Sequence, residues 1–184
     1  MTSPTSPTIH ASAVLVGARA VLIRGASGAG KSRLALELLE AGAAGHLRLV
    51  RLIGDDRVRL TSAGGRLLVR PAPQLAGLIE LRGTGIVRLD YEPCAVVGLV
   101  VDLAAADAER LPEKSAIVVD GVELRRLAVA PGAAPLPTVL AALGAYSGAV
   151  AHPYLPVDAG VHDLLRAAAI EVSARVSRDE LAFG

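Results

Sequence analysis

Short runs of apolar residues, separated by glycine, proline and charged residues, fill most of the chain and predict strands. The first two runs, 12–16 and 20–24, flank Gly17-Ala18 and predict a β-hairpin. After this hairpin the apolar residues recur at the spacing of one helix face, at Leu34, Ala35, Leu38 and Leu39. We therefore predict a strand that leads through a glycine-rich loop into a helix that runs to about Glu40, where Ala41-Gly42 supplies a stop.

The rest of the pattern predicts more strands than helices. Residues 47–53 form an apolar run that closes on two aspartates, and residues 57–61 and 66–70 alternate across a glycine-containing turn, which predicts a second hairpin. Further strands are predicted at 75–80, 86–89, 95–103, 117–120 and 123–129, and helices at 138–145 and 161–176. A doubly wound domain would alternate strands and helices throughout, so we predict an α/β fold with a mixed, strand-rich sheet.

The composition is that of a soluble folded domain. Of 184 residues, 52% are hydrophobic and 20% are charged, which excludes global disorder and suits a single domain. The net charge is +1 and the arginines are spread along the chain, so no nucleic-acid partner is expected. Charges and prolines interrupt every apolar run before it could span a membrane, so no membrane partner is expected either. We expect residues 1–9 to be a disordered leader and residues 10–184 to be one domain.

Two features favour a cytoplasmic location. The first ten residues, MTSPTSPTIH, lack the basic start and apolar core of a secretory signal peptide. Cys94 is the single cysteine and cannot form an intramolecular disulfide, which suits a reducing compartment.

The loop after the first hairpin is the strongest chemical motif in the chain. Residues 25–32 read GASGAGKS and match the phosphate-loop pattern G-x-x-x-x-G-K-[ST] at every specified position, between a predicted strand and a predicted helix. Its glycines let successive backbone N–H groups turn toward phosphate oxygens at the positive end of the helix. Lys31 can reach the outer phosphates and Ser32 can ligate magnesium. The predicted nucleotide-binding residues are Gly25, Ala26, Ser27, Gly28, Ala29, Gly30, Lys31 and Ser32.

Asp55 and Asp56 are the first chemical candidates outside this loop. They end a predicted apolar strand, which is where a phosphate-loop protein meets magnesium or its bound waters. Because aspartate after Gly54 also favours turns, a purely structural turn is the alternative interpretation.

Three blocks of sequence narrow the class of phosphate-loop protein. The first runs from His10 through VLV into GASGAGKS and LALELLE, the second is LIGDD, and the third is IELRGTGIV at residues 79–87. Together they resemble the catalytic domain of HPr kinase/phosphorylase, which phosphorylates a serine of the bacterial phosphocarrier protein HPr. The corresponding family motifs are H-G-V-L-V before G-x-S-G-x-G-K-S, L-V-A-D-D, and I-E-I-R-G-L-G-I-I. The resemblance covers most of residues 10–132.

The resemblance implies a catalytic role for the second aspartate. Asp56 would accept the proton of the target serine, and would donate a proton when phosphate attacks the phosphoserine in reverse, while Asp55 supports it and Lys31 binds the phosphates. The chemistry of the residues agrees with this role. A serine hydroxyl is a poor nucleophile, so a carboxylate within hydrogen-bond reach must accept its proton as the bond to phosphorus forms.

The resemblance also implies roles for residues outside the two main motifs. Ser32, Glu80 and Asp55 would hold Mg²⁺, His10 would lie near the active site, and Arg110 would be the catalytic arginine. Each has a structural alternative: Glu80 as part of a solvated strand face, Arg110 as a surface charge, and His10 as the end of the leader.

As a whole, the resemblance implies an ATP- and magnesium-dependent serine kinase of HPr or an HPr-like carrier, connected with the phosphotransferase system and the regulation of carbohydrate metabolism. It further implies reverse phosphorolysis, a phosphoenolpyruvate-carboxykinase-like phosphate-loop fold and a homo-oligomer, namely a hexamer. Two other functions stay open from the residues alone: a kinase of a small metabolite, and a switch that binds ATP without transferring phosphate.

The chain departs from the family pattern at several positions. Arg33 and Thr84 replace an acidic residue and a leucine, and residues 43–46 are an insertion. VAPGAA at residues 129–134 lacks both arginines of the family's V-R-P-G-R-N, a stretch associated with the reverse reaction, so phosphorylation is the more strongly expected direction. We expect the short form of the enzyme, without the family's N-terminal domain.

Overall fold

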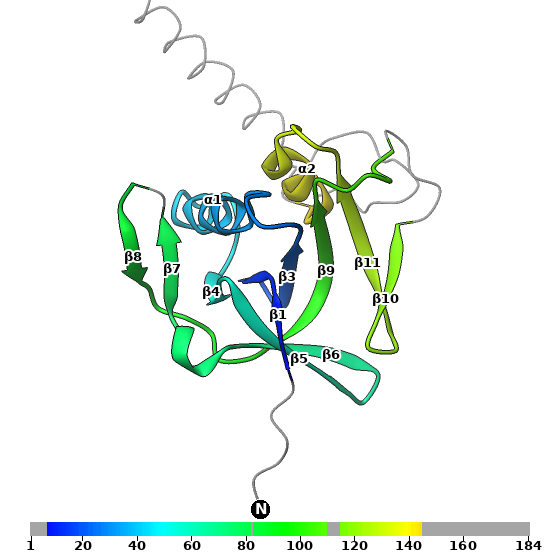
Figure 1. The fold of residues 1–184 in the computed structure, drawn as a ribbon, viewed down its shortest axis with the longest axis horizontal. Coiled ribbons are helices and arrows are strands. Elements are labelled where there is room, and N and C mark those ends of the chain that lie inside the picture. Colours follow the sequence, from blue (N-terminus) through cyan, green and yellow to red (C-terminus); the bar gives the residue numbers. More distant parts are fainter. Residues whose placement is uncertain (1–6, 82, 110–114, 145–184) are drawn as a thin grey trace, which may run out of the picture. The chain divides into compact units, whose positions relative to one another are not determined.

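The computed structural model describes residues 7–81, 83–109 and 115–144 (Figure 1). The chain divides into two compact units, residues 1–136 and 137–184. The first unit contains every described strand. In the second unit, the described residues 137–144 include most of helix α2 (Pro135–Ala142).

A nine-stranded mixed sheet builds the first unit, which confirms the predicted strand-rich α/β fold. Its hydrogen-bonded order is β1–β5–β6–β9–β3–β2–β4, while β11 pairs with β9 and β10 pairs with β11. The strands are β1 (Thr8–His10), β2 (Ser12–Val16), β3 (Arg19–Arg24), β4 (Val50–Gly54), β5 (Arg57–Ala63), β6 (Arg66–Pro71), β9 (Ala95–Leu103), β10 (Ala116–Val119) and β11 (Val122–Val129).

Three of these strands run parallel and carry the phosphate loop. Strand β9 pairs in parallel with both β3 and β11, so that Asp102 lies opposite Arg24 on one side and Ala128 on the other. Parallel strands present their carboxyl ends at one edge of the sheet. The loop that follows Arg24 is therefore built at the same edge as the ends of β9 and β11 (Figure 1).

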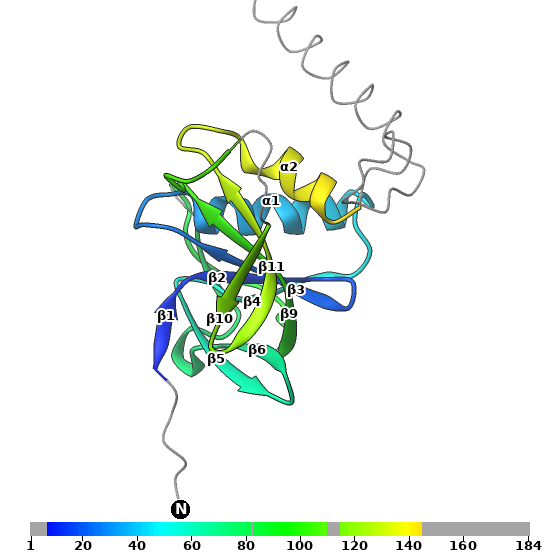
Figure 2. The same ribbon diagram turned by 90° about the vertical axis from the view of Figure 1, so that its right-hand side faces the viewer.

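Helix α1 (Lys31–Ala43) covers one side of the sheet and contacts β2, β3 and β4. Figure 2 shows it from the side, running along one face of the sheet. Its buried apolar side chains are Leu34, Ala35, Leu38 and Ala41. The first three are among the four that the helical spacing singled out, whereas Leu39 is only partly buried. Burial of each leucine stabilises the fold by about 1.5–3 kcal/mol, so this apolar stripe holds the helix that follows the phosphate loop in place.

A second apolar core lies between β2 and β3 and the inward faces of β5 and β6. Its fully buried members include Ala11, Ala13, Leu22, Ile53, Val58, Leu67, Val69 and Val100. On β5 and β6 these residues alternate with outward positions that hold arginines together with Thr61 and Leu68. This core is aliphatic, as expected from a chain that contains no tryptophan and one phenylalanine.

A small separate hairpin holds the third sequence block. It consists of β7 (Leu78–Leu81) and β8 (Gly85–Arg88), which pair only with each other, and β7 contacts α1. A strand over 75–80 was expected, but residues 73–75 form a 3₁₀ turn, η1 (Pro73–Leu75). Gly77 then adopts φ 73°, a conformation that interrupts an extended chain. The strand accordingly begins at Leu78.

Other boundaries also differ from the expectations. Thr8 and Ile9, which we assigned to a disordered leader, form β1 with His10 because Ile9 packs against the apolar core. Helix α2 begins at Pro135 rather than 138, since proline suits the first turn of a helix. The helix expected over 161–176 lies outside the described residues. Within the described residues, no helix is long and apolar enough to cross a membrane.

Candidate active site

The phosphate loop connects β3 to α1 in a backbone conformation that requires glycine. Gly25, Gly28 and Gly30 have φ angles of 146°, 80° and 95°, where side chains are disfavoured. At Gly25 a Cβ would also lie 2.9 Å from the backbone oxygen of Leu103, at the end of β9. No side chain caps the start of α1 and its first turn has no acidic residue, so the N–H groups there face the loop without a protein anion competing for them.

Lys31 is buried and folded back onto the loop. Its ammonium group donates hydrogen bonds to the backbone oxygens of Gly25 and Ala26, at 3.1 and 3.0 Å. Burial lowers the pKa of Lys31, and this effect outweighs the opposite influence of the nearby negative charges of Asp55 and Asp56. The lysine therefore lies within electrostatic reach of both aspartates, and its present partners are neutral carbonyl groups that an anion can replace.

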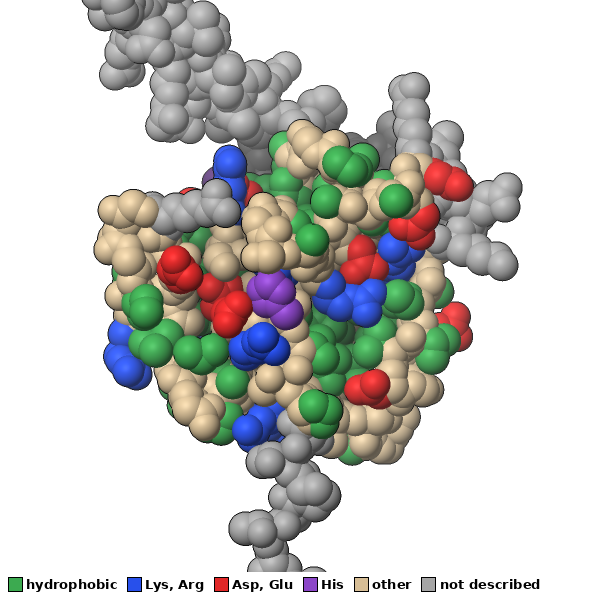
Figure 3. All heavy atoms as spheres, in the orientation of Figure 1, with side chains coloured by type: hydrophobic (Ala, Val, Ile, Leu, Met, Phe, Trp, Pro, Cys, Tyr) green, Lys and Arg blue, Asp and Glu red, His purple; other side chains and the backbone are tan. Residues whose placement is uncertain are grey.

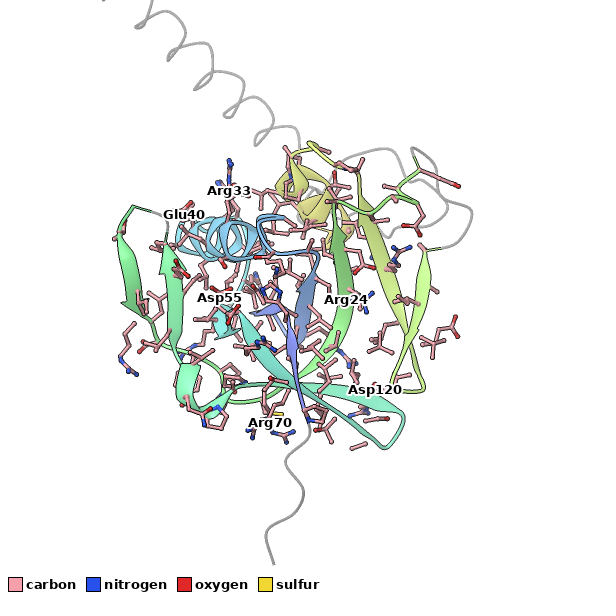
Figure 4. All side chains as sticks on the ribbon, viewed as in Figure 1. Arg24, Arg33, Glu40, Asp55, Arg70 and Asp120 are labelled. Atoms are coloured by element: carbon pink, nitrogen blue, oxygen red, sulfur yellow. The ribbon has the colours of Figure 1, made fainter. Side chains whose placement is uncertain are left out.

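Asp55 and Asp56 point into different surroundings. Asp55 is 3% exposed and accepts a hydrogen bond from the hydroxyl of Ser12, itself completely buried on β2. The backbone N–H group of Arg57 donates a hydrogen bond of 2.7 Å to the backbone oxygen of Asp55, and this bond closes a tight turn. Figure 4 shows Asp55 beneath helix α1. Asp55 is thus anchored within the protein, and its supporting role in catalysis stays a prediction.

Asp56 occupies a strained position at the protein surface. Its φ is 61°, a left-handed conformation that is uncommon for residues other than glycine and that concentrates at functional sites. Its side chain is 61% exposed, and its Oδ1 lies 3.2 Å from Nε2 of His10. In Figure 3 a histidine lies near the middle of one face, with acidic side chains on one side and basic ones on the other. His10 is ordered in β1 rather than part of a loose leader.

A network of charged residues beside the loop escaped the sequence analysis. Asp102 on β9 accepts two hydrogen bonds from Arg24, at 2.7 and 2.8 Å, and one of 2.6 Å from Arg126 on β11. Arg126 also binds Asp107 through two more bonds, at 2.6 and 3.0 Å. Because Arg24 directly precedes Gly25, this network ties the entrance of the phosphate loop to the end of β9 and to β11.

The charges in this network shift one another's pKa values. Burial favours a higher pKa for Asp102, but the hydrogen bonds and positive charges of Arg24 and Arg126 prevail and hold it below its ordinary value. Asp107 and Asp102 in turn raise the pKa of Arg126. The sequence contained a clue, since an aspartate near the end of a buried apolar strand needs a charged or hydrogen-bonding partner.

The remaining predicted residues are less completely placed. Glu80 lies exposed on β7, and Ser32 is partly buried in the first turn of α1. Arg110 lies outside the described residues. In the part of the chain that the structure describes, no three His, Cys, Asp or Glu side chains gather closely enough to hold a metal by themselves. The assignment of magnesium to Ser32, Glu80 and Asp55 therefore stays a prediction.

Comparison with known proteins identifies the class of this fold. A solved structure described as the Hpr(Ser) kinase/phosphatase from Coxiella burnetii superposes with a TM-score of 0.61 at 22% identity, covering 75% of this chain and 93% of that one. The strand–loop–helix unit on a mixed sheet is thus a phosphate-loop kinase fold. Residues 3–92 also match the family model of the HPr serine kinase C-terminal domain. This stretch of the chain is therefore similar to the HPr serine kinase C-terminal domain.

Curated relatives show the same similarity. HPr kinase/phosphorylase of Geobacillus thermodenitrificans is 35% identical over 143 residues, which cover 69% of this chain and 44% of the relative. The protein of the same name from Mycoplasma mycoides is 43% identical over 84 residues, covering 46% of this chain and 24% of the relative. The chain therefore spans less than half the length of these relatives.

Proposed function

We propose that this chain is an ATP- and magnesium-dependent protein serine kinase that phosphorylates HPr or an HPr-like carrier protein. The observations that support this best are the glycine-rich loop closed around the Lys31 ammonium group and the exposed Asp56 carboxylate that follows β4. A phosphate-binding lysine beside an exposed carboxylate brings a phosphoryl donor and a proton acceptor to one site, which is what phosphoryl transfer to a hydroxyl requires. The names of the relatives supply the carrier as the acceptor.

Proton transfer is assigned to Asp56. Its exposed carboxylate accepts the proton of the incoming serine hydroxyl as the new phosphorus–oxygen bond forms. His10, 3.2 Å away, orients this carboxylate. Lys31 exchanges the carbonyl oxygens of Gly25 and Ala26 for the outer phosphate oxygens of ATP, which gives its ammonium group charged partners.

Oxygen donors near the loop fit magnesium. The Ser32 hydroxyl lies in the first turn of α1, Asp55 supplies a buried carboxylate, and Glu80 supplies a second carboxylate on β7. Hard oxygen ligands of this kind, together with ATP phosphates and water, are what Mg²⁺ prefers. When bound, magnesium would neutralise phosphate charge during transfer. Arg110 remains the proposed cation at the transferred phosphoryl group.

We further propose that the reverse reaction is weak. Asp56 can return the proton when phosphate attacks a phosphoserine, but Val129–Ala134 contains no arginine to hold a second anion. We propose a cytoplasmic, homo-oligomeric enzyme, by analogy with the family. The remaining candidates are a metabolite kinase and an ATP-dependent switch without transfer.

Transfer of labelled phosphate from ATP to purified HPr tests the proposal, with Asp56→Ala as the variant. We expect a loss of at least about 10²-fold in rate, the usual contribution of a general base. Asp120→Ala is a matched control because Asp120 is also exposed, with φ 48°, and lies at the β10–β11 turn, away from Asp55 in Figure 4. Both substitutions place alanine in a left-handed conformation, so only the chemistry differs.

Each outcome selects one function. Label on a carrier serine that disappears only in Asp56→Ala supports the proposal, and label that persists in Asp56→Ala contradicts the catalytic assignment. Label found on a small molecule alone favours the metabolite kinase. ATP binding without any transfer by the unmodified chain favours the switch.

A further inference from the structure

The hairpin β5–β6 exposes an arginine-rich face. Along both strands the buried apolar residues alternate with outward ones, which include Arg57 and Arg59 on β5 and Arg66 and Arg70 on β6. Arg59 and Arg70 are directly opposite each other in the antiparallel register. We call these four arginines the arginine face.

The arginine face is not neutralised by the described residues. Ion pairs in the described part of the chain involve other arginines, namely Arg24, Arg33 and Arg126. The Nε of Arg59 is buried and has no hydrogen-bond acceptor. Like charges directly opposite each other on neighbouring strands destabilise a sheet, and a buried donor without an acceptor does so as well. Features that cost stability in the free protein are typical of a binding surface.

This face is continuous with the candidate active site. Arg57 directly follows Asp56, and the register of β1 with β5 sets His10 opposite Arg57 and Thr8 opposite Arg59. Figure 3 shows basic side chains continuing below the histidine on the face that carries it. A protein whose serine reaches Asp56 would therefore lay the residues that flank the serine along β5 and β6.

We infer that the arginine face docks an acidic segment of the phosphate-accepting protein, next to its target serine. This inference rests on the proposed function and adds a property of the substrate. Side chains on one face of a strand repeat every second residue, about 6.6 Å apart, so carboxylates at alternate positions of an extended segment match Arg57 and Arg59. Bidentate binding of carboxylates by guanidinium groups gives such contacts strength and orientation. A single-stranded nucleic acid would need aromatic side chains for base stacking, and the outward positions of β5 and β6 have none.

The test reverses charge on the arginine face and measures phosphorylation kinetics with purified HPr. For Arg59→Glu/Arg70→Glu we expect KM for HPr to rise at least about fivefold, with kcat and KM for ATP changed less than about twofold. Arg48→Glu, an exposed arginine before β4, is the matched control and should change none of these constants. Polyglutamate should compete with HPr for the unmodified chain and not for the double variant.

A second variant separates docking from folding. Arg70→Gln removes one of two opposed charges, so its melting temperature should equal or exceed that of the unmodified chain while KM for HPr rises. A lower melting temperature with unchanged KM would make the face structural.

The remaining outcomes distinguish a failure of the docking inference from a failure of the kinase proposal. If the unmodified chain phosphorylates HPr and the double variant does so with the same KM, the docking inference is wrong and the kinase proposal stands. If the unmodified chain binds ATP but phosphorylates no protein, the kinase proposal itself is wrong. If the double variant changes its oligomeric state with normal HPr kinetics, the face binds another copy of the chain and the inference is wrong. If the double variant loses binding to a DNA oligonucleotide with normal HPr kinetics, the face binds nucleic acid and the inference is likewise wrong.

Discussion

Asp102→Asn should destabilise the protein because Arg24 and Arg126 lose the carboxylate that binds them both. The substitution keeps the size of the side chain but removes the negative charge that Arg24 and Arg126 share. Asparagine can accept a hydrogen bond through its oxygen, while its amide group turns donors toward a guanidinium that is itself only a donor. The variant therefore leaves Arg24 without a carboxylate partner and Arg126 with Asp107 alone, and only one neutral acceptor lies between the two guanidinium groups.

The size of the effect follows from the burial of the network. Asp102 is 14% exposed and its partners 27% and 21%, so solvent screens these pairs only in part. Removing one partner of a buried ion pair costs roughly 3–5 kcal/mol, and partial exposure places the expectation near the lower limit, at about 3 kcal/mol. For a unit of this size the melting temperature should fall by roughly 6–12 °C.

The effect should depend on pH in a defined direction. The pKa of Asp102 is lower in the folded protein than its unfolded value near 3.8, so folding favours the charged carboxylate. Its contribution is fully present above the unfolded pKa and is lost as the pH falls through the folded pKa. The difference between the two proteins should be complete at about pH 7 and should shrink below about pH 4.

Urea unfolding followed by circular dichroism measures both quantities. Asp107→Asn is the control, because Asp107 is 65% exposed and binds Arg126 alone, and its effect should be much smaller. The reasoning is refuted if Asp102→Asn unfolds at the same urea concentration as the unmodified chain, or if its deficit is the same at acidic and neutral pH.

Three further substitutions test the loop and the strained aspartate. Gly25→Ala places a Cβ 2.9 Å from the Leu103 oxygen and should abolish ATP binding by calorimetry, and normal affinity would show that the loop tolerates the shift. Lys31→Met should weaken ATP binding by about 10²-fold, because the phosphates lose a charged partner. The melting temperature of the nucleotide-free protein should not fall, because the substitution removes a desolvated charge, and marked destabilisation would contradict this. Asp56→Gly should unfold in urea with a free energy about 1 kcal/mol higher than that of Asp56→Ala, since glycine tolerates φ 61°. Both variants should lack transfer activity. Equal stability of the two variants would mean that the turn is unstrained.

The phosphate loop and its flanking elements could be predicted because their information is local. A glycine pattern, a preceding apolar strand and a following apolar stripe lie within one stretch of sequence, and α1 buries three of the four residues that the spacing singled out. The anchoring of Asp55 and the exposure of Asp56 were less accessible. They depend on Ser12, 43 residues away from Asp55, and on a left-handed backbone that adjacent aspartates do not reveal.

The network around Asp102 could not be predicted because it depends on register. Arg24 and Asp102 are 78 residues apart and meet only because β3 and β9 pair in parallel with these two positions opposed. A shift of one residue would turn either side chain to the other face of the sheet. The arginine face escaped prediction for a similar reason, since Arg59 and Arg70 belong to different strands and scattered arginines look evenly spread along the sequence.

The dependence of the phosphate loop on β9 has a consequence for synthesis of the chain. The carboxylate that fixes Arg24 leaves the ribosome 78 residues after it, which at roughly 5–20 residues per second is a delay of about 4–16 seconds. During this interval β3 has no parallel neighbour and Gly25 lacks the Leu103 backbone beside it. The family model itself ends at residue 92, before β9 begins. A nascent chain that already carries the glycine loop, both aspartates and the third block would therefore still lack the strand that completes its nucleotide site.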